Sequence, residues 1–395
     1  MRGAWALLLF AAAACGSGRG GEARSVRPFH RLPPSGTRIL VLAPHPDDEI
    51  LGAGGLMETA VLRGATVHVV VATDGEHGPD RVGAGPGLAA TREIETRQAA
   101  ARIGLGADAL SFLGYADGSL AAAWGERWTA SPRDGGAEPA DAIVDALRSA
   151  LDAAAPDTLV LPLTIDAHPD HAALARFALL AVLAESSRPR LPEILGYLIH
   201  GHRQWPAHGP DPMACEPPPD GCAGSLFPWA ALVLDPAEVM RKASLIEGFR
   251  SQIGRSRRLF RYASRDEPFA RGEVVRAPRA TAPSHPGVHR TAHGVVARVP
   301  RGGCTVEPDA GDRIRLRFLR EARVEERLVR PNGETPQGGV LGAPFGPASD
   351  VRVVTHRGAI RLELGGALAD ARGAVVEILP GGGKRDYPPA WLLLW

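Results

Sequence analysis

The sequence has little cysteine, few aromatic residues, almost no lysine and no excess of charge of either sign. Of its 395 residues, 45 are Lys or Arg and 44 are Asp or Glu, so the formal net charge is +1. This balance gives no electrostatic footprint for nucleic acid or for an anionic membrane surface, and we expect no nucleic acid as a partner. Apolar residues make up 45% of the chain, which is ordinary for a soluble protein. The length suits one large domain and a smaller module.

The N-terminus carries a short apolar run that is too short to span a bilayer. Arg2 precedes this run, which extends from Ala4 to Ala14, and Cys15 follows it. A positive start, a short apolar stretch and small residues describe a secretory signal. Ala-Ala-Ala-Cys also resembles a bacterial lipoprotein signal, in which Cys15 becomes the lipidated first residue. We therefore predict a signal over residues 1–15, a flexible tether over 16–37, a lipid anchor at Cys15 and a secreted or periplasmic location in a bacterial envelope. Plain cleavage near Ala14 is the alternative.

The other cysteines allow one disulfide. Cys215 and Cys222 bracket a short Pro-rich loop that a disulfide would close in an oxidising compartment. A zinc pair is the alternative, but no second Cys or His pair follows at ligand spacing. We expect Cys304 to be a buried small apolar residue.

Strands and helices are predicted to alternate through the first two thirds of the chain. Buried strands are indicated over residues 38–43, 66–72, 110–113, 158–161 and 194–199. Helices are indicated over residues 48–62, 92–103, 140–154, 170–184 and 236–254. This order predicts an α/β domain over residues 38–275, with a Rossmann-like, mainly parallel sheet and helices on both faces.

The pattern changes near residue 276. Segments over 294–299, 313–318, 351–354 and 360–364 alternate apolar with polar residues, and Gly- and Pro-rich turns separate them. These features predict a smaller, β-rich accessory domain over residues 285–395. The sequence leaves the role of this domain and the oligomeric state open.

Two His-Pro-Asp segments stand where predicted strands end and helices begin. The first is His45-Pro46-Asp47-Asp48, and the second is His168-Pro169-Asp170-His171. Taken alone, either segment is explained as a helix start, because Asp is a common N-cap and Pro a common first helical residue. Open α/β sheets place their ligands at this edge, however, and imidazole and carboxylate are suitable zinc ligands. The pair therefore favours a metal site whose fourth position is open to water.

These motifs resemble those of the PIG-L/LmbE family of zinc-dependent de-N-acetylases, which remove acetyl groups from N-acetylglucosamine-type amines. The likeness continues through Thr73-Asp74-Gly75-Glu76 and through Phe112-Leu113-Gly114-Tyr115-Ala116-Asp117-Gly118, and it spans about Arg38 to Arg271. It does not cover the C-terminal module. The resemblance implies that Zn²⁺ is held by His45, Asp48 and His171, although another divalent ion would also suit such a site.

The same resemblance implies further roles. Asp47 would be the general base, and His168, once protonated, would stabilise the developing oxyanion. Arg92 and Asp117 match positions that hold sugar hydroxyls, for which a fork of donors and a carboxylate acceptor are suitable. For Asp170, orientation of one of the histidines and a plain helix cap are both open.

We therefore expect a zinc-dependent hydrolase that removes an N-acetyl group from an amino sugar or glycoconjugate of the cell envelope. One alternative is a glycan-binding envelope lipoprotein without turnover, and another is the same metal site acting on an ester or another amide. We expect Glu49 to be a structural carboxylate in the first turn of its helix and not a catalytic acid. Four further residues either line the cleft or are ordinary packing residues: His77, His200, His202 and Trp205.

Overall fold

The computed structural model describes residues 27–28, 34–78, 86–125, 127–185, 190–201, 205–206, 216, 228–253, 257–271, 274–276, 287–291, 294–300, 313–320, 323–330, 337–340, 346–348, 350–356, 359–366, 371–379 and 390–394. The predicted signal, the lipid anchor and all four cysteines lie outside these residues, as does most of the predicted tether. Among the helices formed within them, none combines the length and apolarity needed to cross a bilayer.

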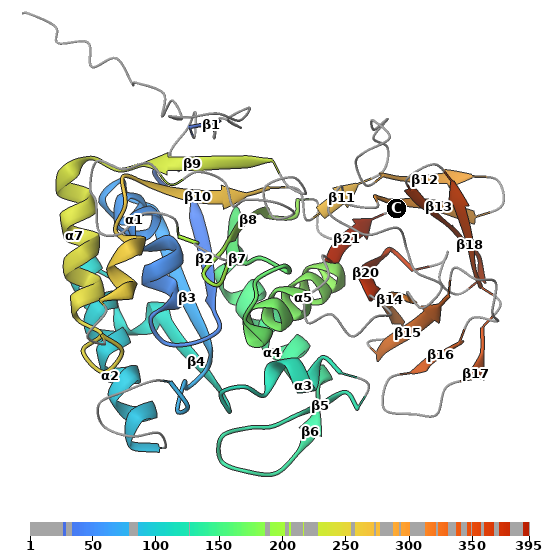
Figure 1. Cartoon of the computed structure of the whole chain (residues 1–395), viewed down its shortest axis with the longest axis horizontal. Coiled ribbons are helices and arrows are strands. Elements are labelled where there is room, and N and C mark those ends of the chain that lie inside the picture. Colours follow the sequence, from blue (N-terminus) through green and yellow to red (C-terminus); the bar gives the residue numbers. More distant parts are fainter. Residues whose placement is uncertain are drawn as a thin grey trace, which may run out of the picture.

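The N-terminal domain is built on an eight-stranded sheet in the order β1-β9-β10-β8-β7-β2-β3-β4 (Figure 1). Its strands are β1 (Arg27–Pro28), β2 (Arg38–Ala43), β3 (Thr66–Thr73), β4 (Leu110–Tyr115), β7 (Thr158–Pro162), β8 (Glu193–Tyr197), β9 (Trp229–Val233) and β10 (Asp266–Ala270). Strands β4, β3, β2, β7 and β8 run parallel to one another, and β10 is antiparallel to both of its neighbours. The predicted mainly parallel sheet is confirmed.

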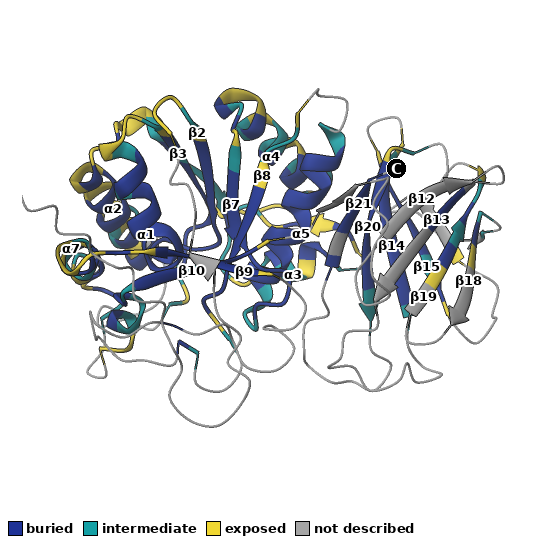
Figure 2. Ribbon diagram, turned by 90° about the horizontal axis from the view of Figure 1, so that it is seen from above, coloured by how far each residue is buried: buried dark blue, intermediate teal, exposed yellow. Residues whose placement is uncertain are grey.

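Helices cover both faces of this sheet, as predicted (Figure 2). Alternate side chains of β2 point to opposite faces: Leu40 and Leu42 join the apolar core beneath α4 and α5, and Ile39 and Val41 join the core beneath α1, α2 and α7. The bounds of the helices are α1 (Asp48–Leu62), α2 (Pro86–Ile103), α3 (Leu120–Ala123), α4 (Asp141–Ala154), α5 (Pro169–Ala184) and α7 (Pro236–Glu247), with 3₁₀ turns η1 (Ala107–Ala109) and η2 (Arg258–Tyr262). A small hairpin, β5 (Thr129–Ala130) and β6 (Glu138–Pro139), follows α3.

Two predicted helix ends were wrong. Helix α7 ends at Glu247 and not near residue 254, because Gly248 has low helix propensity and the chain turns there. Its start is specified locally, since Asp235 and Glu238 form a reciprocal capping box. Helix α2 begins at Pro86, six residues before the predicted start, and proline is favoured at the first helical position.

The C-terminal part forms two further sheets. One has seven strands in the order β11-β21-β20-β14-β15-β16-β17, and the other has four in the order β12-β13-β19-β18. Their side chains share one apolar core, in which Val295 and Leu362 of the smaller sheet join Ile314 and Phe318 of the larger. The strands are β11 (Val274–Arg276), β12 (Gly287–Thr291), β13 (Gly294–Pro300), β14 (Arg313–Arg320), β15 (Arg323–Val329), β16 (Gln337–Val340), β17 (Gly346–Pro347), β18 (Val351–His356), β19 (Ala359–Leu364), β20 (Gly373–Leu379) and β21 (Ala390–Leu394).

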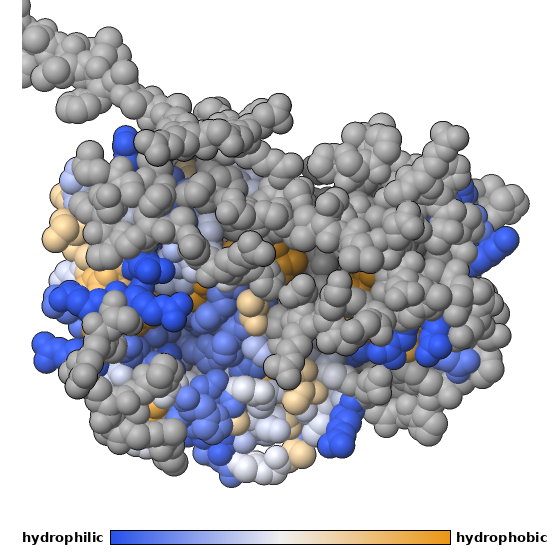
Figure 3. All heavy atoms as spheres, in the orientation of Figure 1, coloured by the Kyte–Doolittle hydropathy of each residue, from blue (hydrophilic) through white to orange (hydrophobic). Residues whose placement is uncertain are grey.

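Helix α5 lies between the two domains (Figures 1 and 2). Every residue from Asp170 to Leu183 is buried, and all of them except Asp170, His171 and Arg176 are apolar. A helix that is largely apolar all round requires cover on every side. The parallel sheet covers one side, and β14, β20 and β21 contact another. Phe177 of α5 therefore shares an apolar core with Val375 and Leu392 of the seven-stranded sheet. The face shown in Figure 3 is mainly hydrophilic where the N-terminal domain is described.

Candidate active site

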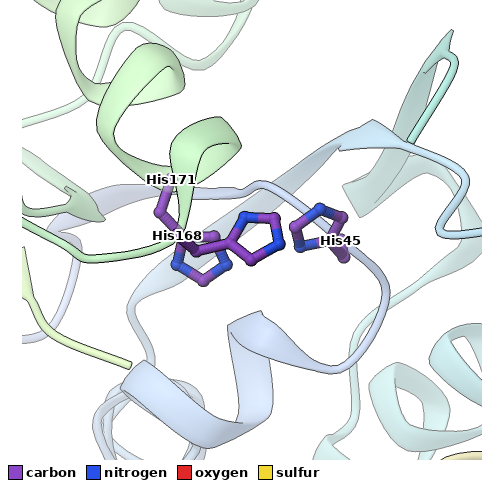
Figure 4. A group of neighbouring side chains, drawn as sticks. All are labelled: His45, His168 and His171. Atoms are coloured by element: carbon purple, nitrogen blue, oxygen red, sulfur yellow. The ribbon is translucent and has the colours of Figure 1, made fainter. Parts of the chain in front are cut away.

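The two His-Pro-Asp segments meet at the point where the strand order of the parallel sheet reverses. Strand β2 lies between β3 and β7, so the chain leaves β2 toward one side of the sheet and β7 toward the other. The loops after β2 and β7 consequently open a crevice at their carboxyl ends, where open α/β sheets bind ligands. His45 lies in the first loop, and His168 and His171 lie at the start of α5 (Figure 4).

One carboxylate oxygen joins the two segments. Oδ2 of Asp48 lies 3.0 Å from Nδ1 of His45 and 3.0 Å from Nε2 of His171. Two atoms that bind one metal ion at about 2.1 Å lie about 3.0–3.4 Å apart, so each of these two separations suits a pair of ligands of one ion. Ring nitrogens of His45, His168 and His171 also lie within 4.8 Å of one another, so His168 belongs to the group that could hold the ion (Figure 4). Nε2 of His171 is also buried without a hydrogen bond. The donor set and the orphaned nitrogen therefore fit a divalent cation.

The electrostatics of this cluster favour positive charge. Burial lowers the pKa of His171, but Asp48 and Asp166 outweigh it and raise that pKa to about 9. The pKa of His45 is raised well above its ordinary value against burial, because Asp117, Asp170 and Asp48 surround its ring. An environment that holds protons on two buried imidazoles would also stabilise a metal cation in their place.

Two buried aspartates brace the histidines. Asp166 directs Oδ2 at Nδ1 of His171, 3.3 Å away, and accepts backbone N–H groups of Ile199 and His200. Sequence reasoning assigned Asp166 no role, although its position two residues before the second His-Pro pair was the available signal. Asp170 places Oδ2 3.5 Å from Nε2 of His45.

The helix-start explanation holds for Pro169, the first residue of α5, but not for the aspartates. The cap of α5 is His168, whose Nδ1 accepts the backbone N–H of Asp170, so Asp170 does not cap its own helix. Asp47 stands at the N-cap position of α1 but makes no side-chain cap hydrogen bond, and its backbone adopts a left-handed φ of 112°. Strained backbone at a non-glycine residue is typical of functional sites.

Burial and neighbouring charges together set the pKa of Asp47. Burial raises its pKa to about 7, Arg92 opposes this rise, and the charge of Asp48 adds to it. Oδ1 of Asp47 lies 3.2 Å from a terminal nitrogen of Arg92. A carboxyl group whose pKa is near neutrality can both accept and return a proton.

Arg92 and Asp117 contact other residues of the chain at the site. Arg92 donates to the carbonyls of Gly75 and Pro46 as well as facing Asp47. Asp117 places Oδ1 3.1 Å from Nε2 of His45, and its Oδ2 accepts the backbone N–H of His77. Both residues thus brace the site, and their contact with sugar hydroxyls stays a prediction.

The ring of His168 is oriented so that its Nε2–H can donate a hydrogen bond. Because its Nδ1 accepts a backbone N–H, the ring proton of the neutral form lies on Nε2. Burial and the neighbouring His45, His171 and His200 lower the pKa of His168 to about 4. This lowered pKa favours the neutral ring, and the role of His168 at the oxyanion stays a prediction.

Other residues that the sequence singled out divide between site and packing. The His200 ring lies 5.0 Å from that of His168 and 4.7 Å from that of His171, so it belongs to the cluster. His77 lies on the rim, and Glu49 accepts the backbone N–H of Asp47, as its structural reading requires. Trp205 donates to the carbonyl of Leu198 and packs near Trp229, and His202 is outside the described residues.

Comparison with known proteins agrees with these motifs. The profile of the PIG-L family, described as GlcNAc-PI de-N-acetylase, matches residues 40–182. No match was found among curated proteins. Similar solved structures include the conserved protein TT1542 of Thermus thermophilus, with 25% identity, 62% of this chain and 96% of that chain covered, and a TM-score of 0.40.

Two further structures are similar over comparable lengths. The N,N'-diacetylchitobiose deacetylase of Pyrococcus horikoshii is 22% identical over 56% of this chain and 72% of that one, with a TM-score of 0.38. The A40926 pseudoaglycone deacetylase Dbv21 is 18% identical over 60% and 96%, with a TM-score of 0.42. The match to the PIG-L family of de-N-acetylases covers residues 40–182 of this chain, and these residues include both strand-end loops of the site.

Proposed function

We propose that the chain is a metal-dependent hydrolase that removes an N-acetyl group from an amino sugar or glycoconjugate. The observation that carries the proposal is the position of Asp48, whose Oδ2 is 3.0 Å from a ring nitrogen of both His45 and His171. Next to this ligand set stands Asp47, a buried carboxyl group whose pKa is raised to about 7. A metal site beside a proton acceptor is the arrangement that hydrolysis of an unactivated amide needs.

The reaction uses the residues as follows. A divalent cation held by His45, Asp48 and His171, zinc or another ion, would lower the pKa of water and polarise the acetyl carbonyl. Asp47 takes the proton of the attacking water as the water oxygen bonds to the carbonyl carbon. Nε2–H of His168 donates to the carbonyl oxygen as it gains charge, a contribution of about 3 kcal/mol. Asp47 then returns the proton to the amine as the C–N bond breaks, giving acetate and the free amino sugar.

The surroundings of these groups support their roles. Arg92 fixes Asp47 by an ion pair and by its hydrogen bonds to the adjoining loops. Asp166 and Asp170 lie beside His171 and His45 and are buried, which limits the rotation of both rings. We propose an envelope glycan as substrate and a lipid anchor at Cys15, because the N-terminal residues have the pattern of a secretory signal.

The test is Asp47→Asn in the metal-loaded protein. We expect acetate release from N-acetylated sugars to fall by about 10²–10⁴, the usual contribution of a general base, while bound metal per chain stays unchanged. Acetate is measured enzymatically and metal by elemental analysis. Asp145→Asn, an exposed change on α4, is the matched control and should leave both quantities unchanged.

Three results would contradict this proposal. Full activity of Asp47→Asn would remove Asp47 from the reaction. Glycan binding by the metal-loaded wild type without any acetate release would favour the glycan-binding alternative. Release of acid from O-acetyl esters but from no N-acetyl sugar would favour the same metal site acting on esters.

A further inference from the structure

A short stretch of chain connects the candidate active site to the C-terminal domain. We call residues 117–125, which include helix α3, the α3 segment. At its beginning, Oδ1 of Asp117 lies 3.1 Å from Nε2 of His45. The backbone N–H groups of Gly118 and Ala121 donate to the two carboxylate oxygens of Asp170, at 2.8 and 3.3 Å. The first half of the α3 segment therefore holds two groups of the site.

The other end of the α3 segment is held by the C-terminal domain. Arg317 of β14 donates to the backbone carbonyls of Trp124 at 2.7 Å and Gly125 at 3.3 Å. The indole N–H of Trp124 donates to Oε2 of Glu377 in β20, 2.9 Å away. The Arg317 guanidinium also lies over the Trp124 ring, 4.2 Å from its centroid. Two side chains of the C-terminal domain thus fix both the backbone and the ring at position 124.

The charges at this junction are fully buried and paired. Glu377 pairs with Arg176 of α5 at 2.6 Å, and Arg317 pairs with Glu326 of β15 at 2.8 Å. Arg317 is 0% exposed. Buried ion pairs add little net stability compared with apolar side chains, because desolvation offsets their attraction. What such a buried and paired network does provide is one defined geometry.

A second connection reaches the loop after β7. The Thr164 hydroxyl donates to the carbonyl of Ala390 in β21 at 3.3 Å, and the Ala390 N–H donates back to that hydroxyl at 3.1 Å. Thr164 precedes Asp166, whose carboxylate faces His171. The C-terminal domain is consequently attached to the segments on both sides of the metal-ligand cluster.

We infer that the C-terminal domain is a structural part of the active site, and that Arg317 and Glu377 are positioning residues. Through the α3 segment they fix the amides that hold Asp170 and the carboxylate that faces His45. Their effect on turnover rests on the proposed function, whereas their effect on the α3 segment does not.

The experiment compares Arg317→Met and Glu377→Gln with a matched control, Arg327→Met. Arg327 is also a buried arginine of this sheet, but its partners Asp350 and Glu325 do not contact the α3 segment. Hydrogen exchange of the peptide that contains Gly118 and Ala121 is measured on metal-free protein. We expect exchange there to accelerate about tenfold or more in the two junction variants and not in the control.

Steady-state kinetics supply the second readout. Displacing the α3 segment misaligns groups that act on the transition state, so we expect kcat to fall by about 10–100-fold with KM changed little. If Arg317→Met does not fold, Trp124→Phe replaces it, because it removes the indole N–H that binds Glu377 and keeps an aromatic ring, although a smaller one, at this position. Like the other junction variants, Trp124→Phe should accelerate hydrogen exchange in the α3 segment and lower kcat.

The inference is overturned if folded junction variants exchange Gly118 and Ala121 at the wild-type rate. It is also overturned if exchange accelerates in an active enzyme while kcat stays unchanged. A wild-type protein that releases no acetate would sink the proposed function alone, since exchange in the α3 segment is still measured there. Equal acceleration in Arg327→Met would assign the effect to general destabilisation and reject the positioning role.

Discussion

At the scale of single residues, the candidate active site is a set of acids and imidazoles whose roles depend on what each one faces. Asp47 and Asp48 are neighbours in sequence, yet the pKa of Asp47 is raised to about 7 and that of Asp48 is lowered well below its ordinary value. Both carboxylates are buried, which raises both pKa values. The difference arises because Asp48 lies between His171 and His45, whereas Asp47 faces a single arginine. The carboxylate of Asp48 therefore suits the binding of a cation, and the carboxyl group of Asp47 suits proton transfer.

Replacing Asp166 with Asn should weaken metal binding by about 10–100-fold, the usual effect of losing a carboxylate behind a metal-binding histidine. The amide keeps the shape of the side chain and an oxygen for the backbone N–H groups, but it loses the charge that faces His171. Metal affinity is measured by competition with a chelating dye. Asp157→Asn, at a half-exposed carboxylate before β7, is the control. Wild-type affinity in Asp166→Asn would show that His171 needs no charged partner.

At the scale of elements, helix α1 contains a break that distant side chains stabilise. Ala53 has non-helical angles, φ −144° and ψ 17°. Glu267 of β10 accepts the N–H groups of Gly55 and Leu56 beyond the break, and Lys242 of α7 donates to the carbonyl of Leu51 before it. Lys242 and Glu267 also pair at 2.5 Å. The backbone groups freed by the break are thus satisfied, which fixes the helix that begins with Asp48.

We expect Lys242→Met to lower the free energy of unfolding by about 3–5 kcal/mol, because it leaves the buried Glu267 carboxylate without its cation. Glu267→Gln leaves the opposite charge unpaired. The double variant Lys242→Met/Glu267→Gln should lose less than the sum of the two single losses, because it buries no lone charge. Urea unfolding followed by circular dichroism gives the three values. Strict additivity would show that the two side chains do not act as a pair.

At the scale of the whole molecule, the two domains share apolar cores and a charged junction. Phe177 of α5 packs with Val375 and Leu392, and Leu163 and Leu198 of the N-terminal domain join the core of the C-terminal sheets. Residues 274–276, at the predicted boundary, form β11 and pair with β21. The C-terminal domain therefore covers surface that the N-terminal domain would otherwise expose, and we expect the two to unfold together.

The charged junction predicts an acid-dependent loss of stability. Burial raises the pKa of Glu377, but Arg176, Arg315 and Arg317 outweigh it and hold that pKa below the ordinary value of 4.5. A carboxyl group whose pKa is lowered in the folded state stabilises that state above the unfolded pKa. The stabilisation is lost as the pH falls below 4.5 and through the lower folded pKa.

Glu377→Gln should therefore lower stability most near neutral pH and flatten its dependence on pH below 4.5. The measurement is the free energy of unfolding of both proteins from pH 7 to pH 3. Glu193→Gln is the control, since the side chains of Glu193 and its partner Arg271 are 50% and 45% exposed. A wild-type and a Glu377→Gln curve that stay parallel over the acid range would contradict this assignment.

The sequence determined the parts that depend on local pattern. Strand β2 and helix α1 have the bounds that their apolar residues predicted, because a buried strand and a buried helix are encoded by neighbouring residues. The two His-Pro-Asp segments located the crevice for the same reason, since the order of strands and helices places their loops at one sheet edge. The family resemblance, which the family match bears out, added roles that no spacing could supply.

Tertiary structure decided which side chains meet. Asp166 and His200 join the cluster only because β8 lies beside β7. Arg92 of helix α2 contacts Asp47, although no local sequence pattern places that helix beside Asp47. The contact of Arg317 with Trp124 joins residues 193 positions apart, and no local pattern specifies such a pair. Periodicity reports which face of an element is buried, whereas the partner across that face depends on how the whole chain packs.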